Sequence, residues 1–170
     1  EVRKDPNSGG TDAEIAAQVK LLAGIKQQLN DAGSAVHRVE SVRLQLQQVQ
    51  RLSTDAEVVR AIRAVDAKLL EVEMKLVDLR QTGTGQDGVR FGSMLISKMG
   101  YLANGMSSSD FTPTTQHVEV DGILREQLKQ HLAAIDGVLA SELAPLNAQL
   151  DAKGLPKVVD RAGPAPRIVP

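Results

Sequence analysis

The sequence predicts an all-α protein, an elongated antiparallel up-down-up-down four-helix bundle with two long outer helices and an extended Pro-rich C-terminal tail. Three observations predict this class. Apolar residues make up 42% of the 170 residues and aromatic residues only 2%, which suits slender, closely packed helices. Apolar residues recur at steps of three and four over long stretches. A coiled-coil-like heptad seam occupies the stretch from Thr54 to Leu79, at Val58, Ile62, Val65, Leu69, Val72, Leu76 and Leu79.

Bulk composition removes several classes of function. Lys and Arg (20) nearly balance Asp and Glu (21), and few aromatic rings are present to stack on bases, so we expect no nucleic-acid partner. No apolar run approaches the ~20 residues that a membrane span needs. The chain has no cysteine, which excludes disulfides and thiolate chemistry.

The first helix is expected to start at Thr11, because Thr11 and Glu14 have the spacing of a capping box. Residues 1–10 before it are interpreted either as a frayed terminus or as the end of a preceding strand, at Val2 and Arg3, followed by a linker. Apolar residues then keep one phase as far as Leu52. Gly33 could mark a break, but the phase carries across it, which favours a single helix of about 40 residues, roughly 60 Å long.

Thr54 and Glu57 form a second capping box, so a second helix is expected to fold back antiparallel and run to Leu79. Its apolar face is widened by Leu70, Met74 and Val77, so more than one neighbour must cover it. After the flexible residues 82–88, a third helix is predicted over 89–106, although three glycines weaken it.

The last helix is expected to begin with Thr112 as N-cap and Pro113 at the first position. It should kink at Pro145 and close at Gly154 after Lys153. Residues 11–154 would thus form one helical bundle, and residues 155–170 an extended Pro-rich tail that is ordered only if it lies on something.

The middle two helices are expected to be shorter than the outer two, which would then protrude at one end. Protruding apolar surface must be covered by the tail, by a neighbouring domain of the same chain or by a second copy. The residues favoured for such contacts surround the short third helix and include every aromatic residue of the chain: Phe91, Met99, Tyr101, Met106 and Phe111.

No arrangement of residues predicts catalysis. No Glu has a His three residues later, as a di-iron bundle requires, and there is no HExxH motif for zinc. His37 and Glu40 stand in the reverse order, and His131 has no suitably spaced acidic partner. The serines of 107–109 lack a glycine elbow, and the glycines of 82–88 lack the Lys-Ser/Thr ending of a phosphate loop. We therefore expect no catalytic residue, metal, cofactor or small-molecule ligand.

Three stretches resemble a known family: EVRKDP at the start, VHRVESVRLQL (Val36 to Leu46), and FGSMLISKMGYLANGMSSSDFTPTTQ (Phe91 to Gln116). They are similar to the C-terminal helical region of bacterial sortilin-like proteins with Asp-box (BNR) repeat β-propellers, often labelled glycosyl hydrolase-like. The resemblance implies an extracytoplasmic setting, secreted or periplasmic, after a small β-sandwich. It carries no site residue onto this chain.

The favoured hypothesis is a non-catalytic structural or assembly module of a larger extracytoplasmic protein, which packs on a neighbouring domain or self-associates. An alternative is a binding module that accepts a peptide or helix in a groove of the bundle. A remote alternative is part of a glycosidase-like enzyme.

Overall fold

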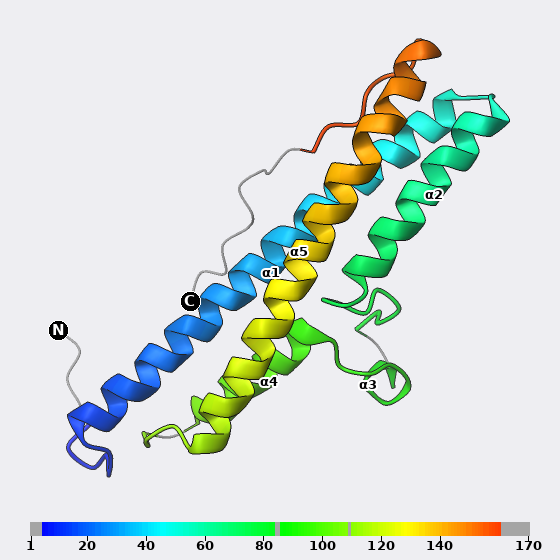
Figure 1. Ribbon diagram of the computed structural model, residues 1–170. Helices are drawn as coiled ribbons and strands as arrows, with labels where there is room; N and C mark the ends of the chain where they lie inside the picture. Colours follow the sequence, from blue (N-terminus) through cyan, green and yellow to red (C-terminus); the bar gives the residue numbers. More distant parts are fainter. Residues whose placement is uncertain (1–4, 84–85, 109, 161–170) are drawn as a thin grey trace.

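The computed structural model describes residues 5–83, 86–108 and 110–160, and within these ranges the chain is helical with no strand. The all-α prediction is confirmed. Two long helices, α1 (Asp12–Leu52) and α5 (Thr115–Ala152), run side by side (Figure 1). Three shorter ones lie between them in sequence: α2 (Ala56–Glu73), α3 (Asp87–Arg90) and α4 (Leu95–Met106). The expected strand end at Val2 and Arg3 lies outside the described residues, as does the tail beyond residue 160.

Helix α1 is a single element of 41 residues that continues through Gly33. Its N-terminus has the predicted capping box, in which the Thr11 hydroxyl accepts the N–H of Glu14 and the Glu14 carboxylate accepts that of Thr11. The carboxylate also accepts a bond from the Thr112 hydroxyl at 2.9 Å. The start of α1 is therefore tied to the loop that precedes α5.

Helix α2 differs from its prediction at both ends. Its N-cap is Asp55, not Thr54, because the Asp55 carboxylate accepts the N–H groups of both Glu57 and Val58. It ends at Glu73, although the apolar seam continues to Leu79. The predicted third helix over 89–106 is also wrong in part: the single turn α3 and an extended stretch precede α4.

The end of α2 and the start of α4 meet almost as one helix. The backbone N–H of Leu95 donates to the carbonyl of Lys75 (3.5 Å) and that of Ile96 to the carbonyl of Leu76 (3.1 Å), so Leu95 takes the place of the fourth residue after Lys75. With that offset, the seam of α2 is continued by the buried residues of α4 at steps of three and four: Leu95, Met99, Leu102 and Met106. Helices α2 and α4 thus form one interrupted helical segment, which we call the middle leg. We call residues 77–94, which leave its line and return to it, the detour.

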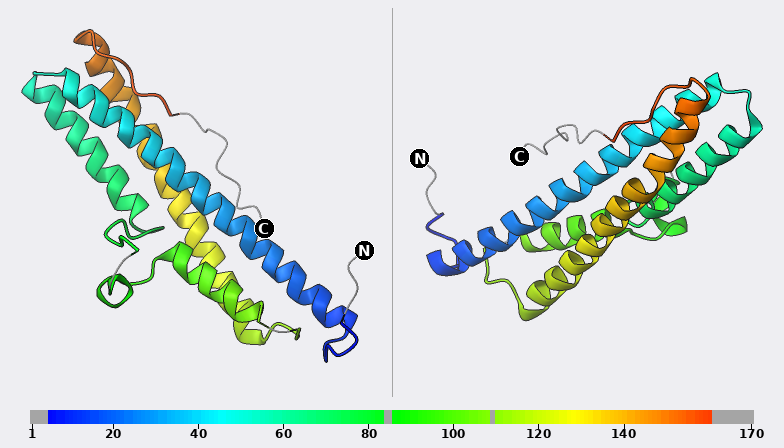
Figure 2. Two further views of the ribbon diagram at one scale, coloured as in Figure 1. Left: turned by 180° about the vertical axis from the view of Figure 1, so that it is seen from behind. Right: turned by 45° about the horizontal axis from the view of Figure 1, so that its top comes forward.

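The helix directions differ from the predicted up-down-up-down order. Gln28 and Arg38 of α1 bond Asp121 and Asp136 of α5, so both helices advance in the same direction, as their colours show in Figures 1 and 2. Both α2 and α4 run opposite to them, one after the other, and each packs against both α1 and α5. The middle leg therefore packs on both halves of the outer helices, although the first turns of α1 still extend past α4 and α5 in Figures 1 and 2.

Helix α5 begins two residues later than predicted. Thr114, not Thr112, is the N-cap, and His117 completes its capping box while Pro113 precedes the cap. The helix continues through Pro145. At its end Gly154 has φ +67°, and the N–H groups of Gly154 and Leu155 donate to the carbonyls of Asp151 and Leu150. These bonds form a Schellman motif, so the prediction for Gly154 is confirmed.

Candidate functional site

An apolar groove between α4 and α5 is the best candidate for a functional surface. Its volume is about 630 Å³, and its floor is made by Leu102 of α4 and Leu124 of α5. Helix α4 leaves room here because Gly105 has no side chain. The groove lies in the half of the molecule where α4 forms the middle leg (Figure 1), and its lining residues are Ser93, Ser97, Lys98, Tyr101, Leu102, Gly105, His117, Val120 and Leu124.

Exposed apolar side chains continue the surface beyond the groove. Tyr101 is 83% exposed at the rim, although a tyrosine ring normally buries most of its area. Val120 is also exposed, and Ile123, three residues further on the same helix, extends its face. We call Tyr101, Leu102, Val120, Ile123 and Leu124 the α4–α5 face.

The structure separates the five residues that the sequence favoured for contacts. Only Tyr101 lies on the α4–α5 face. Met99 (1% exposed) and Met106 (0%) lie in the core, so neither can meet a partner while α4 stays packed. The half-buried Phe91 ring lies under the Arg80 guanidinium, 4.7 Å from its centroid, and Phe111 lies 6.0 Å from the His117 ring.

A buried charge cluster joins α1 to α2. The Glu73 side chain is 0% exposed, and its Oε2 accepts a 2.7 Å bond from Arg43. Arg43 also donates to Asp66 at 2.9 Å. Burial raises the pKa of Glu73, and the bond from Arg43 opposes this effect. Because the Arg43 guanidinium bonds to both carboxylates and joins the two helices, the arrangement is that of a structural ion cluster rather than of an acid–base site.

A second polar layer joins α1 to α5 through side-chain amides. Gln28 donates to Asp121 at 2.7 Å, and Arg125 pairs with the other oxygen of the same carboxylate at 2.6 Å. Gln18 donates to the main-chain carbonyl of Met106. Among residues 5–83, 86–108 and 110–160, no group of three or more His, Asp or Glu side chains is placed to hold a metal ion.

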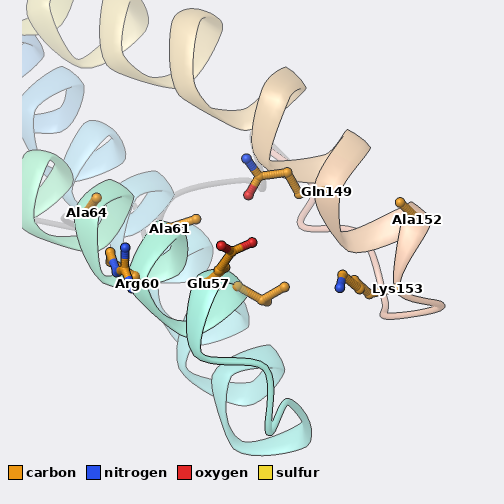
Figure 3. A pocket seen from close by; sticks show the side chains of 8 residues that line it. Glu57, Arg60, Ala61, Ala64, Gln149, Ala152 and Lys153 are labelled. Atoms are coloured by element: carbon orange, nitrogen blue, oxygen red, sulfur yellow. The ribbon is translucent and has the colours of Figure 1, made fainter.

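A hollow of about 530 Å³ lies between α2 and α5 near the α1–α2 hairpin (Figure 3). Glu57 and Arg60 line it from α2, and Gln149 and Lys153 from the end of α5. Lys153 binds the N-cap residue Asp55 at 2.7 Å, and this bond is the main cause of the lowered pKa of Asp55. Its charged lining fits a solvated helix flank better than a ligand site.

Residues 158–160 of the tail are held on α1 and α5 by three side chains that sequence reasoning missed. Asn147 makes two 2.8 Å bonds to the main chain of Val158, and Gln45 makes two 2.9 Å bonds to that of Val159. Arg38 binds both oxygens of Asp160, at 2.8 and 2.6 Å. We call Arg38, Gln45 and Asn147 the tail clamps. The only signal in the sequence was the expectation that an ordered tail must lie on something.

Comparison with models of protein families, with curated proteins and with solved structures finds no match for this chain. In the part of the chain that the structure describes, no helix is both long enough and apolar enough to cross a membrane.

Proposed function

We propose that this chain is a non-catalytic helical assembly module that associates with a second copy of itself through the α4–α5 face. The observation that carries the proposal is the apolar groove between α4 and α5, with Tyr101 exposed at its rim. Contiguous exposed apolar side chains favour contact with another protein surface over contact with water.

The helix arrangement supports a second copy as the occupant. In this half of the molecule three helices pack together, α1, α4 and α5, and the exposed apolar residues Tyr101, Val120 and Ile123 have no further helix over them among the described residues. Two copies that face each other would supply it mutually. Helices α4 and α5 of the two copies would then form a four-helix arrangement between the chains.

The charges around the face are compatible with a two-fold arrangement. Lys98 lies on the α4 side of the groove, while Glu119 and Glu126 flank Ile123 on α5 at helical spacing. In an isologous contact the same patch meets itself, so the basic side of one copy can face the acidic side of the other. Such rim pairs favour orientation more than affinity.

The proposed setting is a larger extracytoplasmic protein with β-propeller repeats, and it rests on the resemblance of three stretches of the sequence alone. The non-catalytic part of the proposal is supported by the mostly apolar surface of the groove, where His117, Lys98 and Tyr101 are the ionisable side chains. Among the described residues, none of these three side chains has an acidic or basic partner in the groove that would make it an acid or a nucleophile.

Sedimentation velocity and light scattering over a range of concentrations test the proposal. We expect the weight-average mass of the natural chain to rise toward that of a dimer, and the doubly substituted Tyr101→Glu, Ile123→Glu chain to remain a monomer. Leu44→Glu is the matched control, because Leu44 is an exposed apolar residue of α1 outside the face. A natural chain that stays monomeric at every concentration, or a dimer that survives the double substitution, contradicts it.

A further inference from the structure

The tail clamps recognise main chain rather than side chains at two consecutive residues. The Asn147 amide donates to the carbonyl of Val158 and accepts its N–H, and the Gln45 amide does the same for Val159. Each amide thus satisfies both backbone groups of one residue, as a neighbouring β-strand would. An extended segment of almost any sequence can make these four bonds.

Two further contacts select the sequence of the segment. The Val158 side chain is buried (1% exposed), so an apolar residue is needed there, while Val159 is exposed. Arg38 holds the Asp160 carboxylate with two parallel bonds, and its third nitrogen binds Asp136, which fixes the plane of the guanidinium. The tail clamps therefore select an extended segment with an apolar residue followed, two positions later, by an acidic one.

The segment is joined to the helix that carries Asn147 by a short connection. The Schellman motif at Gly154 reverses the chain, and exposed Pro156 and Lys157 lead into Val158. The bonds that hold Val158, Val159 and Asp160 come from the tail clamps, and these lie on α1 and α5. They would be the same if the segment belonged to another molecule, which is the condition for exchange of an element between protomers.

We propose that the tail clamps Arg38, Gln45 and Asn147 form a docking site for an extended apolar-any-acidic segment, and that a second copy of this chain supplies that segment, residues 155–160, by reciprocal exchange.

A second copy is the occupant to which the contacts point, because the only segment seen to fit is the chain's own. Each copy carries one such site and one segment, so a two-fold exchange restores every bond made by the tail clamps. The tethered segment competes at an effective concentration on the order of millimolar, so exchange is favoured at high protein concentration or when one tail is released. The site is independent of the α4–α5 face.

The test uses two variants of the whole chain, both with Tyr101→Glu and Ile123→Glu so that the α4–α5 face cannot contribute. One has a defective docking site (Arg38→Ala, Asn147→Ala) and an intact tail. The other has an intact docking site and a defective tail (Val158→Asp). Neither can exchange tails with itself. We expect a 1:1 heterodimer by sedimentation only when the two are mixed, and at least about tenfold weaker association when the donor tail also carries Asp160→Asn.

A mixture that remains monomeric overturns the proposal, and so does association that does not depend on Asp160. Circular dichroism establishes that each variant is folded, and Asp160→Arg, which opposes Arg38 at the surface, replaces Val158→Asp if the latter is not. A capped peptide with the sequence LPKVVD should dissociate the heterodimer. The same peptide with methylated nitrogens at both valines keeps its side chains but loses two N–H donors, and equal competition by it would overturn the inference of backbone recognition.

Discussion

Replacement of Arg43 by methionine should destabilise the protein strongly at neutral pH. The Glu73 side chain is fully buried, and its Oε2 has Arg43 as its partner while its Oε1 has none within the described residues. Removal of one partner from a buried ion pair costs about 3–5 kcal/mol, because the remaining charge is unsolvated. In a chain of this size, that loss corresponds to a fall in Tm of roughly 6–20 °C.

The loss should depend on pH in a defined direction. Burial already raises the pKa of Glu73, and without Arg43 the pKa rises further. Between the pKa of the unfolded chain and the raised pKa of the folded one, the native state binds more protons, so stability falls as pH rises. The deficit of the Arg43→Met variant should therefore be small near pH 4 and grow toward pH 7.

Urea and thermal unfolding followed by circular dichroism from pH 4 to 8 measure both effects. Arg63→Met, which removes an exposed arginine of α2, is the control and should change the unfolding free energy by less than about 0.5 kcal/mol. The double variant Arg43→Met, Glu73→Met should recover most of the loss, since apolar replacement of a buried pair is often neutral or better. A deficit no larger than the control's at pH 7, or one that does not shrink on acidification, would refute the reasoning.

One deletion and two substitutions probe the backbone. Deletion of residues 77–92 joins Leu76 to Ser93 in helical phase, so we expect unchanged helicity by circular dichroism and an unfolding free energy higher by about 1–2 kcal/mol; loss of cooperative unfolding would contradict the phase argument. Gly33→Ala, in an open position of α1, should add about 0.5–1 kcal/mol in urea unfolding, and a loss would indicate a hidden contact. Gly10→Ala should cost about 1–3 kcal/mol, because its Cβ would lie 2.8 Å from the carbonyl oxygen of Asp110; an unchanged Tm would show that the loop yields freely.

Local signals predicted the helix ends only where one capping residue was available. Thr11 with Glu14, and Gly154 after the last helix, were read correctly because each has a single set of backbone partners. Two polar residues compete at the other starts. Asp55 prevails over Thr54, and Thr114 over Thr112, through bonds that depend on the path of the preceding loop.

The apolar seam predicted burial well and helix continuity badly. Leu76 is buried although it lies beyond the end of α2, and the seam resumes at Leu95 after the detour. Periodicity reports which side of a leg faces the core, not whether the backbone between two turns is continuous. The direction of α4 is set by bonds from Leu95 and Ile96 to carbonyls about twenty residues earlier, which no local pattern contains.

The candidate site was predicted only through Tyr101. Composition marked the aromatic residues and methionines of the third segment, but helical phase in the folded chain separates exposed Tyr101 from buried Met99. The tail clamps had no signal of their own. Gln45 and Asn147 lie at the flanks of apolar stripes, where polar residues are ordinary, and only the course of the tail gives them a role.

The detour in the middle leg has a practical consequence for protein engineering. The chain leaves the helical line after Leu76 and returns at Leu95, which takes the position three residues after Leu76. The packing of the core therefore does not depend on how many residues lie between them. Lengthening a loop adds only about 0.6 kcal/mol per doubling. The position is thus suited to receive an epitope, a reporter domain or new chain ends after circular permutation, while the rods on either side keep their alignment.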